Sequence, residues 1–411
     1  MSLPPHTAEK PTWHFALLIA IPALLLWGIF SFSPNFKFTD MENTKSSPLG
    51  GDYLQEYTGG WILNDSRLRE SLYDLKTFKR QQHNDKVTGF PWDDSQYFPA
   101  VYPPFWYAAV SPLSKIDYPI AAHLWALLMT VCLIIALLLI YRFTSVPIFL
   151  LLILCLCSPV IHSISSGQKG TLLLLIFTAS FVLLKKLKPT GSGVVFALSL
   201  FKPYLGVCIG LLMLVRGNWR WVAATLLTVA AIVGLTWLTM PQLSRDYIDV
   251  CLGFGDYVKS GGYDLAKSYS LWSGWQMLIS HSTTAKVLTG LTALAVLVGS
   301  LIFLRRLPGD QPDSLDVAFA VMMLVTAITA PHFYYYDLTL LILPAAIFAS
   351  HTTQTKFNRV QWMPVILIAA AMFGSGLIEQ IGLATNISLG PILLVAAIVF
   401  ALRNAAKPAP L

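Results

Sequence analysis

The sequence is poor in charge and in residues that support metal or disulfide chemistry. Only 12% of its 411 residues are charged, whereas 55% are hydrophobic. Because a soluble globular protein carries about twice as many charged residues, this composition excludes an ordinary soluble domain. The five cysteines show neither a disulfide framework nor metal-ligand spacing, and the sequence has no Gly-rich phosphate loop and no fixed-period repeat. We therefore predict no cofactor and no metal site.

The hydrophobic residues form long blocks without helical or strand alternation, which is typical of membrane spans. The first block, Trp13–Phe32, is too long for the core of a signal peptide, and no small-residue cleavage site follows it, so we expect an uncleaved first span. Further blocks cover residues 119–141, 146–164, 170–184, 192–201, 204–215, 219–240, 285–303, 314–330, 336–350, 361–377 and 387–402. The sequence thus predicts an all-α polytopic membrane protein with about 10–12 membrane segments, in which residues 1–411 form a single integral membrane domain.

Basic residues gather in short clusters between these blocks. The clusters are Lys10, Arg142, Lys185–Lys188, Arg216–Arg220, Arg305 with Arg306, Lys356 with Arg359, and Arg403 with Lys407. If all are cytoplasmic, both termini are inside. Residues 33–118 then form a first outer loop and residues 241–284 a second. Topology accounts for the net charge of +7, and we predict no nucleic-acid partner.

One segment, Ser192–Val215, tests this orientation because both of its flanks are basic. Each arm has about ten to twelve residues, which at 1.5 Å per residue crosses roughly half of a ~30 Å hydrocarbon core. A re-entrant hairpin with Lys202 and Pro203 at its tip fits, because a proline disfavours helix at the preceding residue. The alternative is one tilted span with a lysine near its middle, which would invert every later loop. We favour the hairpin.

The first outer loop begins with "LGGDYLQEYTGGWIL", Leu49–Leu63, which carries Asp52 and Glu56 one helical turn apart. A carboxylate close to a bilayer is costly unless it is solvated or paired, and it often marks function. Both could be ordinary loop acids, since the loop contains several others. We favour a role for Asp52 as a general base, with Glu56 as a second catalytic candidate.

Aromatic residues and lysines elsewhere could complete such a site. The segment 97–113 is aromatic but interrupted by prolines, and any helix in it should begin at or after Pro104. It is either an interfacial aromatic belt or a wall for a lipid-like tail or a sugar. Lys169 in "SSGQKG" and Lys202 in "LFKPY" either snorkel to the interface or bind phosphate as point charges.

The turn "PHFYYYD", residues 331–337, adds His332 and Asp337. His332 is either packed at the interface or placed to orient an acceptor hydroxyl or a phosphate. Asp337 opens the next apolar block, where an acid also suits the helix dipole, and it is a candidate for substrate binding.

At these motifs the chain resembles glycosyltransferase family 87, the polytopic α-mannosyltransferases of the GT-C superfamily that use polyprenyl-phosphate sugars. The similar pieces, in order, are "GDYLQEYTGG", "YPPF", "LSLFKPY" and "PHFYYYD". The resemblance implies a GT-C-type helical bundle in which Asp52 matches the family's catalytic aspartate. It also implies a hexosyltransferase that moves a sugar such as mannose from a polyprenyl-phosphate donor to a lipid- or glycan-linked hydroxyl.

We accordingly expect Asp52, Glu56 and His332 to be catalytic. Five further residues are expected to bind substrate: Lys169, Lys202, Tyr102, Tyr53 and Asp337. The expected partners are the donor, the acceptor and membrane lipids, and the expected location is a bacterial plasma membrane with the active face outside. Two alternatives are a lipid-linked sugar polymerase or ligase and a transporter or flippase. The second outer loop, however, has a single arginine between residues 241 and 275, and no inverted repeat is clear.

Overall fold

The computed structural model describes residues 10–33, 36, 48–84, 87, 97–257, 264–279, 282–307, 312–353 and 359–405. Within these residues the chain is helical and has no β-strand beyond an isolated bridge between Ser268 and Tyr334, which confirms the all-α prediction. The α-helices are α1 (Thr12–Phe32), α2 (Tyr53–Asn64), α3 (Leu75–Gln82), α5 (Pro104–Val110), α6 (Tyr118–Phe143), α7 (Ile148–Cys155), α8 (Ser158–Ser165), α9 (Gly170–Lys185), α10 (Pro189–Ala197), α11 (Val207–Val215), α12 (Trp219–Thr239), α13 (Pro241–Tyr257), α14 (Leu271–Leu278), α15 (Ser282–Arg305), α16 (Pro312–Thr329), α17 (Ile342–Thr353), α18 (Arg359–Phe373), α19 (Ser375–Thr385) and α20 (Leu389–Ala405). The 3₁₀ helices are η2 (Arg69–Ser71), η3 (Ser111–Lys115), η4 (Leu198–Phe201), η5 (Pro203–Leu205), η7 (Leu265–Lys267) and η8 (Tyr335–Leu341).

The apolar helices of the bundle coincide with the apolar blocks of the sequence. Four of them, α1, α6, α12 and α15, are long and apolar enough to cross a membrane. The pairs α7–α8 and α18–α19 pass the same test together but bend by 52° and 73° at a short break. Five further apolar segments among the described residues are shorter, with 10–17 residues each. The chain is therefore a multi-pass integral membrane protein.

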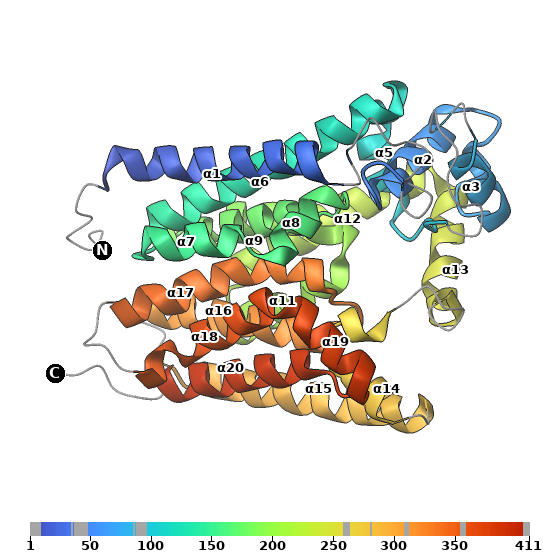
Figure 1. Cartoon of the computed structure of the whole chain (residues 1–411). Coiled ribbons are helices and arrows are strands. Elements are labelled where there is room, and N and C mark those ends of the chain that lie inside the picture. The colour runs from blue at the N-terminus through green and yellow to red at the C-terminus, as the bar shows by residue number, and fades with distance from the viewer. Residues whose placement is uncertain are drawn as a thin grey trace.

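The two ends of the bundle differ in character. In Figure 1 the start of α1 and the end of α20 lie at one end, on the left, here called the terminal end, whereas α2, α3, α5 and α13 gather at the other. Basic residues at the terminal end bind backbone carbonyl groups of neighbouring segments. There Lys10 donates to the carbonyl oxygen of Thr144 at 2.7 Å, and Arg216 donates to that of Ser314 at 3.2 Å. This arrangement fits the predicted topology, although Lys356 and Lys407 lie outside the described residues.

The segment between α9 and α12 forms the hairpin rather than a single tilted span. Trp221, at the start of α12, donates from Nε1 to the hydroxyl of Ser192 in α10 at 3.0 Å. Because α11 ends at Val215, just before α12, both ends of the segment lie at the terminal end of the bundle. Lys202 lies at the tip between the arms, with φ −130° and ψ 68°, the non-helical conformation expected before Pro203.

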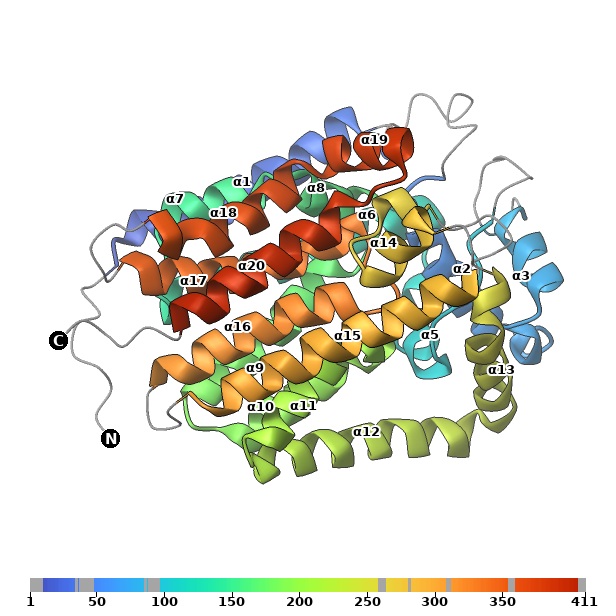
Figure 2. The same ribbon diagram turned by 90° about the horizontal axis from the view of Figure 1, so that it is seen from below.

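Short helices cover the end of the bundle opposite the termini. Helix α5 begins at Pro104, as the sequence predicts, because Pro103 is extended at φ −66° and ψ 155°. Helix α13 turns away from α12 and reaches the region of α3 (Figure 2). There the ring of its Tyr247 lies 5.9 Å from that of Tyr73. The segment predicted as the second outer loop thus contains helix α13, and this helix packs against the segment predicted as the first outer loop.

Candidate active site

Helix α2 is held in place at its start by close backbone approaches that only glycine permits. Gly51 has φ +58°, and a Cβ atom on it would lie 2.8 Å from the Cα of Ser166. Gly167 has φ +67°, and its Cβ would lie 2.5 Å from the carbonyl oxygen of Gly50. The left-handed conformation and the missing side chains therefore let the segment before α2 contact the loop 165–170 directly.

A second glycine pair fixes the side of α2 that faces α5. A Cβ atom on Gly59 would lie 2.1 Å from the ring of Tyr107, and one on Gly60 would lie 2.3 Å from the hydroxyl oxygen of Ser114. Both positions are buried within α2. The two glycine pairs thus allow α2 to pack closely against its neighbours. This packing places Asp52 and Glu56, which lie between the pairs in the sequence, against the loop 165–170.

Asp52 lies directly before α2 and is bound to the loop 165–170 by its backbone and its side chain. Its N–H donates to the carbonyl oxygen of Ser166 at 3.0 Å, and Gln168 donates from Nε2 to its Oδ2. Burial raises the pKa of the Asp52 carboxyl to about 6, an effect that the positive charge of Lys169 partly opposes. Asp52 remains partly exposed, so a substrate can reach it.

Glu56, one turn further along α2, forms a fully buried ion pair with Lys169. The Lys169 Nζ also lies 4.0 Å from the centroid of the Tyr102 ring, a cation–π contact. Burial raises the pKa of Glu56, and Lys169 opposes this shift. Lys169 binds Oε1 of Glu56, whereas Oε2 is buried without a hydrogen bond.

Lys202 reaches the same region from the hairpin tip. Its Nζ lies 2.8 Å from Oδ1 of Asp337, and both side chains are buried. The other oxygen of Asp337, Oδ2, accepts a hydrogen bond of 3.2 Å from the backbone of Tyr334. Lys202 also lies 5.4 Å from the ring of Tyr336. Asp337 thus orients the lysine and at the same time caps the start of η8.

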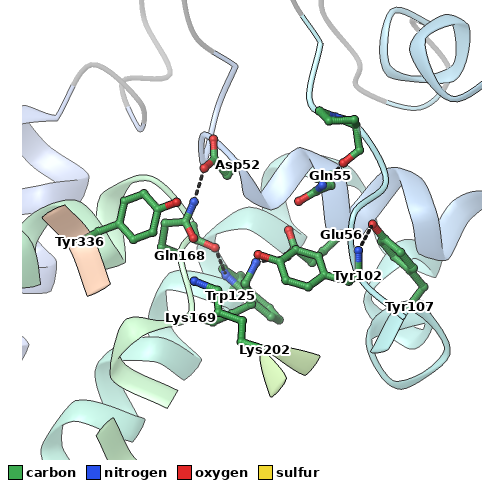
Figure 3. A network of polar contacts seen from close by, with 12 residues as sticks. Asp52, Gln55, Glu56, Tyr102, Tyr107, Trp125, Gln168, Lys169, Lys202 and Tyr336 are labelled. Carbon is green, nitrogen blue, oxygen red and sulfur yellow. Dashed lines mark hydrogen bonds and ion pairs between the residues drawn. The ribbon is translucent and has the colours of Figure 1, made fainter. Parts of the chain in front are cut away.

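The carboxylates and lysines converge from segments that are far apart in sequence. Figure 3 shows Asp52 and Glu56 of the first loop, Gln168 and Lys169 before α9, and Lys202 around Tyr102, with Tyr336 beside Gln168. Asp52, Glu56 and Asp337 carry three negative charges when ionised, whereas Lys169 and Lys202 carry two positive ones. Because a bound phosphate adds negative charge here, it must compete with these carboxylates for the lysines.

Two aromatic candidates, Tyr53 and Tyr102, pack beside this cluster. The ring of Tyr53 stacks on that of Trp125 at a centroid distance of 4.9 Å and an angle of 24°. Trp125 in turn donates to the carbonyl oxygen of Gly167 at 2.8 Å, which fixes the loop that carries Gln168. Tyr102 contacts Lys169, as described above. The segment that contains Tyr102 therefore forms a wall of the site.

His332 is connected to this cluster through an aromatic neighbour. Its Nε2 lies 3.4 Å from the hydroxyl oxygen of Tyr336, and its ring stacks on Tyr334 at 5.2 Å. Burial, with a smaller contribution from the charge of Lys202, lowers the pKa of His332 to about 4. The imidazole is therefore neutral near pH 7, which suits hydrogen bonding rather than neutralisation of a phosphate.

An apolar groove of about 220 Å³ runs beside the hairpin tip. It is lined by Pro103, Pro104 and Phe105, by Leu200 and Pro203, by Val233, Thr236 and Trp237 of α12, and by Ser244, Tyr247 and Ile248 of α13. Leu200 and Pro203 flank Lys202 in the sequence, so the groove adjoins the lysine. The proline-rich segment 97–113 thus contributes both the groove wall and Tyr102.

Sequence reasoning did not identify Gln168, Trp125 or Tyr336. Gln168 directly precedes Lys169, which the sequence already marked as a candidate for substrate binding. This adjacency was the one sequence feature that could have pointed to Gln168. Among the described residues, no group of three or more His, Cys, Asp or Glu side chains is arranged to hold a metal ion.

The chain matches the model of a known protein family. Residues 100–333, more than half of the 411-residue chain, match the model of glycosyltransferase family 87. The match includes Lys169, Lys202 and His332, whereas Asp52 and Glu56 precede it. No curated protein and no solved structure matches the chain.

Proposed function

Because the chain belongs to glycosyltransferase family 87, we propose that it moves a hexose such as mannose from a polyprenyl-phosphate donor to a hydroxyl of a lipid- or glycan-linked acceptor. The observation that carries this proposal is the convergence of Asp52, Lys169 and Lys202 beside an apolar groove. Such a site offers a base, two cations and a surface for a lipid tail. We place it on the outer face of a bacterial plasma membrane, since the basic clusters lie at the opposite end of the bundle.

The groove supports a lipid-linked donor. Its lining is almost entirely apolar, and it adjoins Lys202 at the hairpin tip. Val233 and Trp237 of α12 line it and are each 38% exposed, so it borders the surface that α12 presents to lipid. An isoprenoid tail in the groove would place its phosphate near the lysines.

The chemistry then divides between the lysines and Asp52. The bond between the anomeric carbon and the phosphate oxygen breaks, and the electron pair leaves with the polyprenyl phosphate. Lys202 and Lys169 stabilise the charge that develops on that oxygen. The acceptor oxygen forms the new bond to the anomeric carbon and transfers its proton to Asp52, which acts as general base.

The remaining candidates support these steps. Glu56 and Asp337 pair with the two lysines and orient them until the phosphate competes for them. Tyr102 borders the sugar beside Lys169, whereas Tyr53, buried against Trp125, supports the loop that carries Gln168. Neutral His332 donates or accepts a hydrogen bond with a substrate hydroxyl.

The test is incubation of the purified protein with a polyprenyl-phosphate mannose and a bacterial membrane lipid extract, followed by mass spectrometry of the products. We expect an acceptor species heavier by one hexose, formed by the native protein and not by the Asp52→Asn variant. Movement of intact donor between the leaflets of a vesicle, without a new glycosidic bond, would contradict the proposal and favour a flippase.

A further inference from the structure

Two buried glutamines of the chain differ in how their amide groups are satisfied. Gln82 is fully buried, and it donates from Nε2 to the carbonyl oxygen of Phe98 at 2.7 Å while its Oε1 accepts from the N–H of Phe98 at 2.9 Å. Gln168 is 3% exposed, donates from Nε2 to Asp52, and has no partner at Oε1. A buried amide oxygen without a partner is destabilising. Structural packing alone therefore does not account for glutamine at position 168.

The surroundings of Gln168 fix its position. The preceding residue, Gly167, accepts a hydrogen bond from Trp125, and the following one, Lys169, is paired with Glu56. The backbone N–H of Asp52 is bound to Ser166 in the same loop. Consecutive residues of the loop thus contact the two carboxylates that lie one turn apart at the start of α2. Within this arrangement the Gln168 amide has little freedom to leave Asp52.

We propose that Gln168 is the positioning residue for Asp52, holding the carboxylate through Oδ2 so that Oδ1 is presented to the acceptor hydroxyl. The amide donates a hydrogen bond to Oδ2, and a charged carboxylate accepts such a bond more strongly than the neutral acid does. Gln168 therefore favours the form of Asp52 that can take a proton. That Asp52 takes its proton from an acceptor hydroxyl rests on the proposed function. The hydrogen bond from Gln168 to Asp52 does not depend on it.

Several other groups act on Asp52 and must be kept constant in a test. Lys169 and Lys202 stabilise its ionised form, Glu56 opposes it, and the phenols of Tyr335 and Tyr336 lie near enough to be affected by its charge. Substituting Gln168 by methionine removes the hydrogen bond at nearly constant volume. Gln168→Glu keeps the shape and adds a like charge. Gln82→Met is the matched control, because it is the same change at a buried glutamine whose amide is bound to the backbone of Phe98.

The measurement is the carboxyl infrared band of Asp52 as a function of pH, taken as the difference between each protein and the same protein carrying Asp52→Asn. We expect the ionisation midpoint to rise by about one pH unit in Gln168→Met, because a hydrogen bond to the charged form is lost. It should rise further in Gln168→Glu and stay unchanged in Gln82→Met. A native midpoint in either folded Gln168 variant would overturn the proposal.

A kinetic arm separates this proposal from the proposed function. If the protein transfers sugar, the acid limb of the kcat profile should move with the infrared midpoint while the donor KM stays within about twofold of the native value. An unchanged acid limb would also overturn the positioning role. If no sugar is transferred but the infrared midpoint moves as expected, the proposed function fails and the positioning of Asp52 by Gln168 stands.

Discussion

Asp52 is unlike the exposed acids of the same loop because the loop 165–170 binds both its backbone and its side chain. Asn has the same shape but cannot take up the acceptor's proton. We therefore expect Asp52→Asn to lower kcat by about 10²–10⁴-fold, the range typical of general base catalysis. The measurement is sugar transfer by the purified variant, with expression and thermal stability compared with the native protein. Near-normal turnover would mean that another group is the base.

The control for this variant follows from burial. Asp65 lies in the same loop and pairs with exposed Arg67, so Asp65→Asn should leave turnover unchanged. Glu56→Gln cannot serve as such a control, because it leaves Lys169 buried without its counter-charge. Loss of one partner of a buried ion pair destabilises the folded protein by about 3–5 kcal/mol. Glu56→Gln should thus lower the melting temperature as well as activity.

The pH dependence of transfer provides a second prediction for Asp52. A general base must be ionised, and burial raises the pKa of this carboxyl to about 6. Activity should therefore be constant above this value and fall tenfold per unit as the pH drops below it. An aspartate with the ordinary value would keep its activity to about pH 4. The check is kcat measured from pH 4.5 to 8; a profile flat to pH 5 would contradict the prediction.

The residue types of the site could be predicted from the sequence, but their pairings could not. Asp52, Glu56, Lys169, Lys202 and Asp337 all stood out because charge near a membrane is costly. Which lysine meets which carboxylate depends on contacts more than 100 positions apart in the chain, and local pattern does not encode them. Gln168 escaped notice because an uncharged amide carries no such signal.

At the scale of elements, the hairpin of α10 and α11 was predictable because its physical cause is local. Basic flanks and two short arms require a return, and Pro203 prevents helix at Lys202. The bends within α7–α8 and α18–α19 were not predicted. Helices α7 and α8 together form the single apolar block 146–164, and α19 lies mostly beyond the block 361–377. The role of the paired glycines in α2 was also not predictable, because it depends on a ring and a hydroxyl contributed by α5 and η3.

The hairpin tip makes a prediction of its own. If Lys202 binds the donor phosphate, Lys202→Met should raise the donor KM by about tenfold or more, because hydrogen bonds to charged groups contribute about 1.5–3 kcal/mol. The measurement is the initial rate against donor concentration. Lys202→Arg keeps the charge and should lose less.

Asp337 provides the control for that experiment. Lys202→Met alone leaves Asp337 buried without its counter-charge, so part of any loss could come from destabilisation. The double variant Lys202→Met with Asp337→Asn should recover thermal stability but not donor affinity. Recovery of both would show that the lysine acts only as a partner of Asp337.

For the whole molecule, the separation of basic clusters from the site predicts a defined orientation. Cys251 is the exposed cysteine among the five, and the other four are buried, so a Cys251→Ser background is suitable for labelling. Exposed Ser66 lies in the first outer loop, and exposed Thr190 lies at the start of α10, at the terminal end. A membrane-impermeant thiol reagent applied to intact cells should label Ser66→Cys and not Thr190→Cys. Equal labelling of the two from outside would contradict the topology.

Helix α12 stands at the margin of the bundle, with only 6% of its apolar stretch buried, and it forms one wall of the groove beside Lys202. The lipid-linked donor proposed above would therefore enter sideways without leaving the bilayer, and its encounter with the enzyme would be a search in two dimensions. The quantity that sets the rate is then the mole fraction of donor in the membrane rather than its concentration in the vessel. Adding inert phospholipid to proteoliposomes at a fixed total amount of donor should slow transfer in proportion to the dilution.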